Sequence, residues 1–291
     1  MLRYCSKEEF NDYIDFAFEL AMDLSKSGYP TYCDGIKTRE MFVERSLKAF
    51  ERDTEQMLLF VYEGEVHGLI HYYWIPDDHY LSTIIININK ATEQALSEFL
   101  SLVSERFKGY DLYLGFPAEN QSAVNYLVNK GLECIENDYN NTTFLEKYGM
   151  VPENNTIIQV GKESYESFRK IHCQIEGDMY WNSERVLADL DNWIIFVKEN
   201  DGEPQGAIYY MNADDGWYEI FGIDIDQGAY DPELFKELLN TALLDANRRN
   251  GKVMTFFCEK EYEESALECG FTCVGNYLCY KAHIEYNKLY P

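Results

Sequence analysis

The order of expected helices and strands runs through the chain twice, and this repeat constrains the fold more than any single motif. In residues 1–150, two helical segments precede a hairpin, a β-branched strand, a helix, a strand, a second helix and terminal strands. Residues 151–291 repeat this order after a polar junction that contains Pro152. Because 291 residues suffice for two ordinary domains, the repeat predicts a duplication with one domain in residues 1–150 and one in residues 151–291.

Local signals support these elements. Ser6 and Glu9 have the spacing of a capping box, which predicts a helix start. The turns at Gly64 and at Asp201-Gly202 separate alternating apolar runs, which predicts two tight hairpins. The run over residues 82–89 is apolar on both faces, as expected of a strand in the middle of a sheet.

Charge and cysteine content narrow the function classes. A net charge of -26 argues against a nucleic-acid partner and favours the approach of cations. The eight cysteines form no CxxC pair, and the first residues lack the apolar core of a signal peptide. The chain has no apolar run of the ~18 residues needed to span a bilayer. We therefore expect a cytoplasmic protein without a membrane partner.

Two sequence motifs resemble a known family. The pattern Asn120-x-x-Ala123-x-x-Tyr126-Leu127-x-x-x-Gly131-Leu132 is similar to the helix signature of the GNAT N-acetyltransferases, and Ser265-Ala266-x-x-x-Gly270-Phe271 is similar to its end. The resemblance implies two tandem GNAT-like domains of the α/β class. Each would have a mixed, mostly antiparallel central sheet flanked by helices. In this signature the glycine supports a left-handed helix end, so a purely structural role is also open.

The resemblance implies acetyl-CoA as co-substrate, bound where the long strand leads into the next helix. Glycines there let the backbone approach the pyrophosphate. Residues 87–94 of the first half contain no glycine, whereas the second half keeps Gln227 and Gly228 among aspartates that repel phosphate. An ordinary strand-to-helix loop is the alternative. The expected cofactor contacts are Ile223, Ile225, Gln227, Gly228, Ala229, Tyr230, Asn120 and Lys90.

The resemblance also implies catalytic roles. An amine loses a proton to a carboxylate near the long strand, and a tyrosine protonates the leaving thiolate. Glu219 shares a strand face with Trp217 and Phe221 and is the expected base, with a positioning role as the alternative. Tyr262 is the expected proton donor. Expected acceptor contacts are Tyr180, Trp181, Tyr210 and Trp217.

No metal site is expected, because none of the five histidines has a partner pattern. His67 and His71 are four residues apart but fall on a strand, where that spacing does not bring ligands together.

The leading hypothesis is therefore an acetyl-CoA-dependent N-acetyltransferase that modifies a primary amine of a small molecule or peptide. In this hypothesis the second half is catalytic and the first half is degenerate. The alternative is a non-catalytic ligand-binding or interaction protein on the same scaffold. The sequence leaves open whether the chain is a monomer or a homodimer.

Overall fold

A computed structural model describes residues 1–148, 156–177, 179–214, 216–228, 230–285 and 288–290. The chain forms two compact units, one made of Met1–Asp138 with Gly275–Pro291 and the other of Tyr139–Val274. Each unit contains one mostly antiparallel sheet with helices on it, as the resemblance implied.

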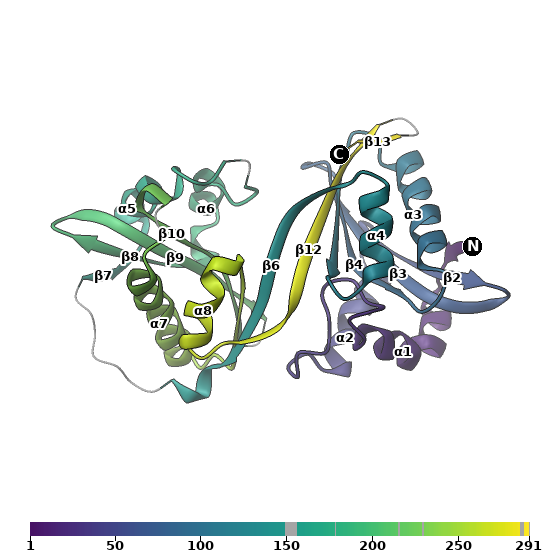
Figure 1. The fold of residues 1–291 in the computed structure, drawn as a ribbon, viewed down its shortest axis with the longest axis horizontal. Coiled ribbons are helices and arrows are strands. Elements are labelled where there is room, and N and C mark those ends of the chain that lie inside the picture. The colour runs from purple at the N-terminus through teal and green to yellow at the C-terminus, as the bar shows by residue number, and fades with distance from the viewer. Residues whose placement is uncertain (149–155, 178, 215, 229, 286–287, 291) are drawn as a thin grey trace. The chain divides into compact units, whose positions relative to one another are not determined.

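In its described residues, the first unit contains four α-helices and a sheet with the strand order β1-β2-β3-β4-β5-β12, with β13 paired to β12 (Figure 1). The β4–β5 pair is parallel, and its other described strand pairs are antiparallel. Its elements are β1 (Leu2–Tyr4), α1 (Lys7–Ala21), α2 (Arg39–Leu47), β2 (Glu55–Tyr62), β3 (Glu65–Ile75), β4 (Tyr80–Ile88), α3 (Thr92–Arg106), β5 (Asp111–Pro117), α4 (Gln121–Asn129), β12 (Thr272–Glu285) and β13 (Lys288–Tyr290).

The second unit repeats this arrangement, with the strand order β7-β8-β9-β10-β11-β6. Here the parallel pair is β10–β11. Its elements are β6 (Glu133–Phe144), β7 (Ile157–Gln159), α5 (Tyr165–His172), α6 (Ser183–Ala188), β8 (Trp193–Asn200), β9 (Glu203–Asp214), β10 (Trp217–Ile225), α7 (Pro232–Arg248), β11 (Val253–Cys258) and α8 (Lys260–Glu268).

The predicted repeat of elements is confirmed, and so are several local signals. Ser6 and Glu9 form a complete capping box at the start of α1. Both hairpin turns place two consecutive residues at positive φ, Glu63-Gly64 and Asp201-Gly202. Two elements differ from the sequence pattern in extent: residues 162–180 have a helical pattern but α5 spans only Tyr165–His172, and the terminal strands predicted for the first half, around residues 133–147, are one strand, β6.

The compact units do not coincide with a cut of the chain between residues 150 and 151. Residues 139–144 of β6 pair with β11 of the second unit, although β6 follows α4 of the first. Residues 277–283 of β12 pair with β5 of the first unit, although β12 follows α8 of the second. The halves therefore exchange their last strands. Local patterns in a single sequence do not show this, because the paired residues lie more than a hundred positions apart in the chain.

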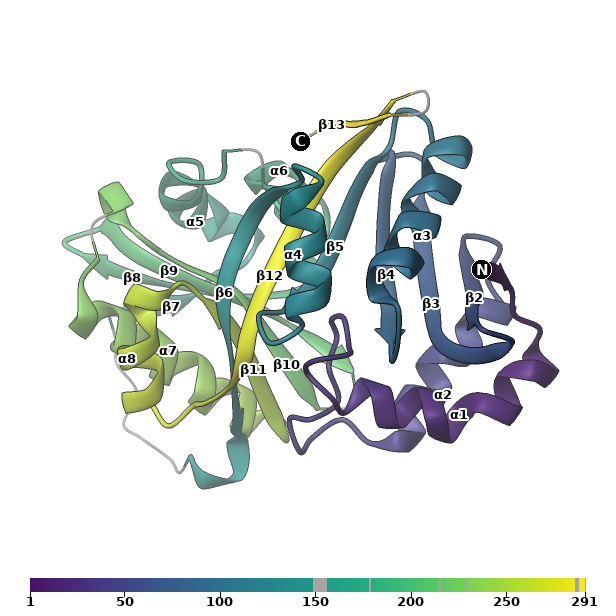
Figure 2. The same cartoon turned by 45° about the vertical axis from the view of Figure 1, so that its right-hand side comes forward.

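Each sheet has a core on both faces. In the first unit, α3 and α4 cover one face and α1 and α2 the other (Figures 1 and 2). In the second unit, α7 and α8 cover the face of Tyr218 and Ile220, and α5 and α6 cover the opposite face. Successive strand residues point to opposite faces, so Glu219 lies on the face of α5 and α6.

The long central strand of each unit has a β-bulge at the same place. In β4 the extra residue is Ile84, and in β10 it is Phe221. The parallel partner strand diverges there, since β4 pairs with β5 only at residues 80–82 and β10 with β11 only at residues 217–220. Beyond these pairs, one edge of each long strand lacks its parallel neighbour and offers backbone groups to another partner.

Candidate functional site

The end of the long strand is open in the second unit. Phe221 is 37% exposed, and Gly222, Ile223 and Ile225 are half-buried. In the first unit, by contrast, all residues from 84 to 88 are buried. The predicted cofactor contacts Ile223 and Ile225 therefore lie on an accessible strand edge, which a ligand can approach.

The loop after β10 is shaped by two residues in the left-handed region, Gln227 at φ 58° and Gly228 at φ 64°. The side chain of Gln174 holds this loop: its Oε1 accepts a hydrogen bond from the Gln227 N–H at 3.0 Å, and its Nε2 donates to Asp226. Gly228 is exposed, and a Cβ there would meet no atom within 4 Å. Ala229, also predicted to contact the cofactor, lies outside the described residues.

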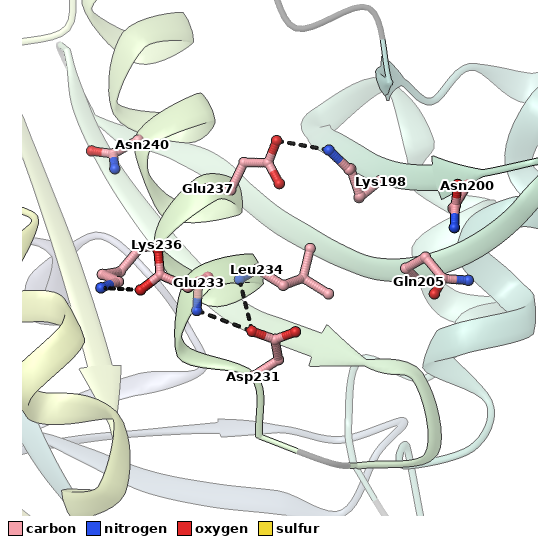
Figure 3. Close-up of a pocket in the computed structure, with 9 residues that line it drawn as sticks. All are labelled: Lys198, Asn200, Gln205, Asp231, Glu233, Leu234, Lys236, Glu237 and Asn240. Carbon is pink, nitrogen blue, oxygen red and sulfur yellow. Dashed lines mark hydrogen bonds and ion pairs between the residues drawn. The ribbon is translucent and has the colours of Figure 1, made fainter.

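The start of α7 already carries an anion. The Asp231 carboxylate accepts hydrogen bonds from the N–H groups of Glu233 and Leu234, at 3.0 and 3.2 Å (Figure 3). Pro232, the first helical residue, has no N–H to donate. A phosphate that approached this helix end would have to compete with Asp231 for the same donors and would be repelled by its charge.

Tyr230 bridges the loop after β10 to the helix after β11. Its hydroxyl lies 2.6 Å from Ser265 Oγ, and its ring contacts the ring of Tyr262 at 4.9 Å. Tyr262 in turn stacks on Phe235 of α7, 5.1 Å between ring centroids. Burial, followed by nearby carboxylates, raises the pKa of Tyr262 to about 12, so its phenol stays protonated at neutral pH. The predicted proton donor is thus one of three aromatic side chains, Tyr230, Phe235 and Tyr262, that pack together beyond the ends of β10 and β11.

The predicted acceptor residues divide between the two faces of the sheet. Tyr180 and Trp181 contact edge to face at 5.1 Å, and Trp181 contacts Trp193 at 5.2 Å. Trp193 contacts Phe221, the bulge residue, at 4.9 Å. These rings form an aromatic patch on the α5–α6 face, with Tyr180 and Phe221 exposed.

Trp217 and Glu219 point to this same face of β10, and Trp217 Nε1 donates to Thr255 Oγ1 at 3.2 Å. Tyr210 does not, so its prediction as an acceptor contact was wrong. It is fully buried beneath α7, and its hydroxyl donates to Asp245 at 2.6 Å. Adjacent strand residues face opposite ways, so Tyr209 and not Tyr210 lies on the α5–α6 face, where it is buried.

A buried polar network beneath the aromatic patch was not predicted. His172 Nδ1 lies 2.7 Å from Asp224 Oδ2, and His172 Nε2 lies 2.9 Å from the carbonyl oxygen of Trp181. The hydroxyl of Tyr209 also interacts with Asp224, and it lies where a Cβ on Gly222 would be, 2.1 Å away. The network ties the end of β10 to the segment that carries Trp181.

Although the sequence shows no partner pattern, several histidines lie beside a carboxylate in the folded chain. His172 pairs with Asp224, and in the first unit His71 Nε2 lies 2.8 Å from Glu55, which also binds Arg45 and Arg52. These carboxylates are distant in sequence, and only the fold brings them beside the histidines. No spacing rule reveals such a pair.

The first unit uses its predicted cofactor residues differently. Lys90 pairs with Glu63 at 2.8 Å on the surface, so its charge already has a partner. Asn120 is 1% exposed; its Oδ1 accepts from the Ala123 N–H, and its Nδ2 donates to the carbonyl oxygen of Ser27 at 3.0 Å. Helix α3 starts at the left-handed Ala91 without a side-chain cap, unlike α7.

A depression of ≈ 620 Å³ lies between α7 and the β8–β9 hairpin of the second unit (Figure 3). Both of its lysines are paired, Lys198 with Glu237 and Lys236 with Glu233, each at 2.7 Å. Its lining comes from α7, the residue before it and the hairpin, and includes nothing from β11 or α8. The depression therefore lies outside the gap between the diverging strands and offers no net positive charge to a phosphate.

The described part of the chain lacks two kinds of feature. No group of three or more histidine, cysteine, aspartate or glutamate side chains there is arranged to hold a metal ion. No helix there has the length and apolar character needed to cross a lipid bilayer.

Similarity to known proteins is detectable in structure only. No family model matches the sequence, and no curated protein matches it. A GCN5-related N-acetyltransferase from Sphaerobacter thermophilus aligns over 98% of this chain and 96% of its own, with 14% identity and a TM-score of 0.64. A tandem GNAT protein from the clavulanic acid biosynthesis pathway aligns over 98% of this chain and 99% of its own, with 9% identity and a TM-score of 0.53.

A third structure is the glucosamine N-acetyltransferase region of a fungal multi-domain β-N-acetylglucosaminidase. It covers 97% of this chain and 38% of that protein, with 11% identity and a TM-score of 0.59. Together these similarities define the class: the chain has the GNAT fold, present twice in tandem.

Proposed function

We propose that this protein is an acetyl-CoA-dependent N-acyltransferase whose second unit is catalytic. One observation carries the assignment. Beyond its bulge, β10 keeps an accessible edge where β11 has diverged, whereas the same part of β4 is buried. Of the two units, only the second leaves this edge reachable to a cofactor that pairs with a strand.

The chemistry follows from the groups around the bulge. Glu219 accepts a proton from the attacking amine, directly or through water. The amine nitrogen forms a bond to the thioester carbonyl carbon, and the oxyanion takes a hydrogen bond from a backbone N–H that the bulge at Phe221 leaves unpaired with β9. The carbon–sulfur bond then breaks, and Tyr262 or water returns a proton to the thiolate.

The acceptor in this proposal is a primary amine on a small molecule or peptide. The aromatic patch of Tyr180, Trp181 and Phe221 suits an acceptor with an apolar or planar body next to its amine. The guanidinium of Arg185 lies 4.1 Å from the centre of the Tyr180 ring, a cation–π contact within the chain. The ring face therefore suits an organic cation. A cytoplasmic location agrees with the eight free cysteine thiols.

A second candidate function, non-catalytic ligand binding, is favoured by one specific feature. Asp231 occupies the helix start that would otherwise hold a pyrophosphate. A protein that binds a neutral or cationic ligand has no need of those donors. Calorimetric titration with acetyl-CoA separates the two functions, because the absence of binding at near-millimolar cofactor excludes the enzyme.

Charge changes at the loop after β10 are expected to alter acetyl-CoA affinity in opposite directions. Asp231→Asn keeps a capping oxygen but removes a negative charge, so the affinity should rise about 3- to 10-fold, the equivalent of ~1 kcal/mol of repulsion. Gly228→Glu adds a charge at the same loop and should lower the affinity at least about 10-fold. Isothermal titration calorimetry measures both.

The matched control for these variants is Lys90→Glu, which makes a similar change at the equivalent loop of the first unit. Its affinity should equal that of the native chain, because Lys90 is already paired and the strand end beside it is buried. If Lys90→Glu lost acetyl-CoA binding and Gly228→Glu kept it, the cofactor would bind in the first unit and the proposal would be wrong.

Glu219→Gln is expected to lower kcat by about 10²- to 10⁴-fold while the KM for acetyl-CoA changes little, because a general base contributes about that much. The loss should shrink as the pH approaches the pKa of the amine, since the acceptor then needs no base. Initial rates across a pH series, with Glu184→Gln on α6 as an exposed control, measure this. A loss that is constant with pH would leave Glu219 a positioning role only.

A further inference from the structure

In the first unit, a piece of the chain's own backbone occupies the edge that is open in the second. We call residues 26–29, from the loop after α1, the plug segment (Figure 2). Each of its four residues makes one main-chain hydrogen bond to β4, β5 or the start of α4. The Lys26 carbonyl accepts from Ile88 N at 2.9 Å, the Ser27 carbonyl from Asn120 Nδ2 at 3.0 Å, Gly28 N donates to Asn87 Oδ1 at 3.2 Å, and Tyr29 N donates to the Gly115 carbonyl at 2.9 Å.

The fit around the plug segment is close. Ser27 is 0% exposed, and Gly28 and Tyr29 are buried. A Cβ on Gly28 would lie 2.2 Å from Ile86 Cγ2 and 3.1 Å from the carbonyl oxygen of Gly115. Both neighbours belong to the diverging strands, so glycine is needed here for close approach.

Two of these contacts satisfy backbone groups that the divergence of β4 and β5 would leave unpaired, the Ile88 N–H and the Gly115 carbonyl. Such buried groups need partners, and an extended ligand with amide groups supplies the same alternating donors and acceptors as a peptide. The pantetheine arm of coenzyme A is a ligand of this kind. The uncapped start of α3 follows directly after β4, so the phosphate-binding end of such a site is also free of a side-chain cap.

We infer that the plug segment is a built-in substitute for a ligand: the first unit retains a slot for an extended, amide-bearing chain, and residues 26–29 fill it. The first unit therefore binds no acyl-CoA in the native protein, and displacing the plug segment exposes a second site. Only the identity of the ligand rests on the proposed function; the occupied slot does not.

Gly28→Val in the full chain tests this inference. The added side chain cannot fit against Ile86, so the plug segment should leave the slot, and trypsin should cut after Lys26 faster than in the native protein. Titration with acetyl-CoA should then give one more binding site per chain than in the native protein. Gly161→Val is the matched control, because its Cβ meets nothing within 4 Å and its φ is -118°.

A folded variant with faster cleavage and an unchanged number of sites would overturn the inference, as would a native protein that binds acetyl-CoA in both units. A folded Gly28→Val that stays resistant to trypsin would overturn it too. If Gly28→Val does not fold, Asn87→Ala combined with Asn120→Ala removes two anchors of the plug segment and serves the same test. A native chain with no site and a variant with one would support the inference and reject the proposed function.

Discussion

A chain that ends at Val274 is expected to lose the fold of its first unit, although every residue removed follows the second unit in sequence. The deletion takes away residues 275–285 of β12, and of these Tyr280, Ala282 and Ile284 are almost fully buried in the first unit's core. Each large buried side chain is worth about 1.5–3 kcal/mol, so Tyr280 and Ile284 alone account for roughly 3–6 kcal/mol. That is comparable to the whole stability of a domain, about 5–15 kcal/mol.

Urea denaturation and proteolysis of the truncated chain measure this effect. The exposed edge of β5 should also promote aggregation, because it presents unpaired backbone groups next to apolar residues. A chain that ends at Glu285 is the matched control, since it keeps β12. If the shorter chain retained a first unit as stable as that of the control, the strand exchange would be refuted.

Asp224→Ala is expected to lower the free energy of unfolding of the second unit by about 3–5 kcal/mol. The substitution leaves His172 buried without its carboxylate partner, and breaking a buried pair costs about that much. Because His172 also holds the Trp181 carbonyl, the aromatic patch should loosen as well. Chemical denaturation followed by tryptophan fluorescence reports both changes.

The same pair predicts how stability depends on pH. Burial opposes the charged imidazolium, but the hydrogen bond and charge of Asp224 outweigh burial and raise the pKa of His172. The folded state thus holds a proton that the unfolded chain releases near pH 6.5. The contribution of His172 to the free energy of unfolding is fully present below that pH and is lost as the pH rises through the raised pKa.

Asp191→Ala, an exposed change in the same unit, is the control for Asp224→Ala and should behave as the native protein does. An equal drop in both variants would mean that the buried pair is not the cause. Equal pH dependence in Asp224→Ala and the native chain would place the titration elsewhere.

The two units show opposite departures from a complete cofactor site. The first has a helix start without a side-chain cap but a filled strand edge, and the second has an open strand edge but a helix start capped by Asp231. Neither unit has both an uncapped helix start and an open strand edge. The second unit is the better candidate because a carboxylate at a helix start can rotate away, whereas residues 27–29 of the plug segment are buried and all four of its residues are hydrogen-bonded.

Part of the candidate site was predictable. Gly228 and Gln227 were expected in the loop after β10, and both adopt the left-handed backbone there. Asp231 caps α7 next to Pro232, a local arrangement common at helix starts. Tyr210 was misplaced, since alternation says that neighbours face opposite sides but not which side lies under α7.

By itself, the sequence determined the order of the elements and the local chemistry of their ends. Periodicity, capping and turn signals act between residues a few positions apart, so they can be read from the chain directly. Only the tertiary structure decided which strand completes which sheet, which carboxylate meets His172 and what fills the gap beside β4. These contacts join residues tens to more than a hundred positions apart, and they form because buried backbone and charged groups must find partners once the sheets are packed.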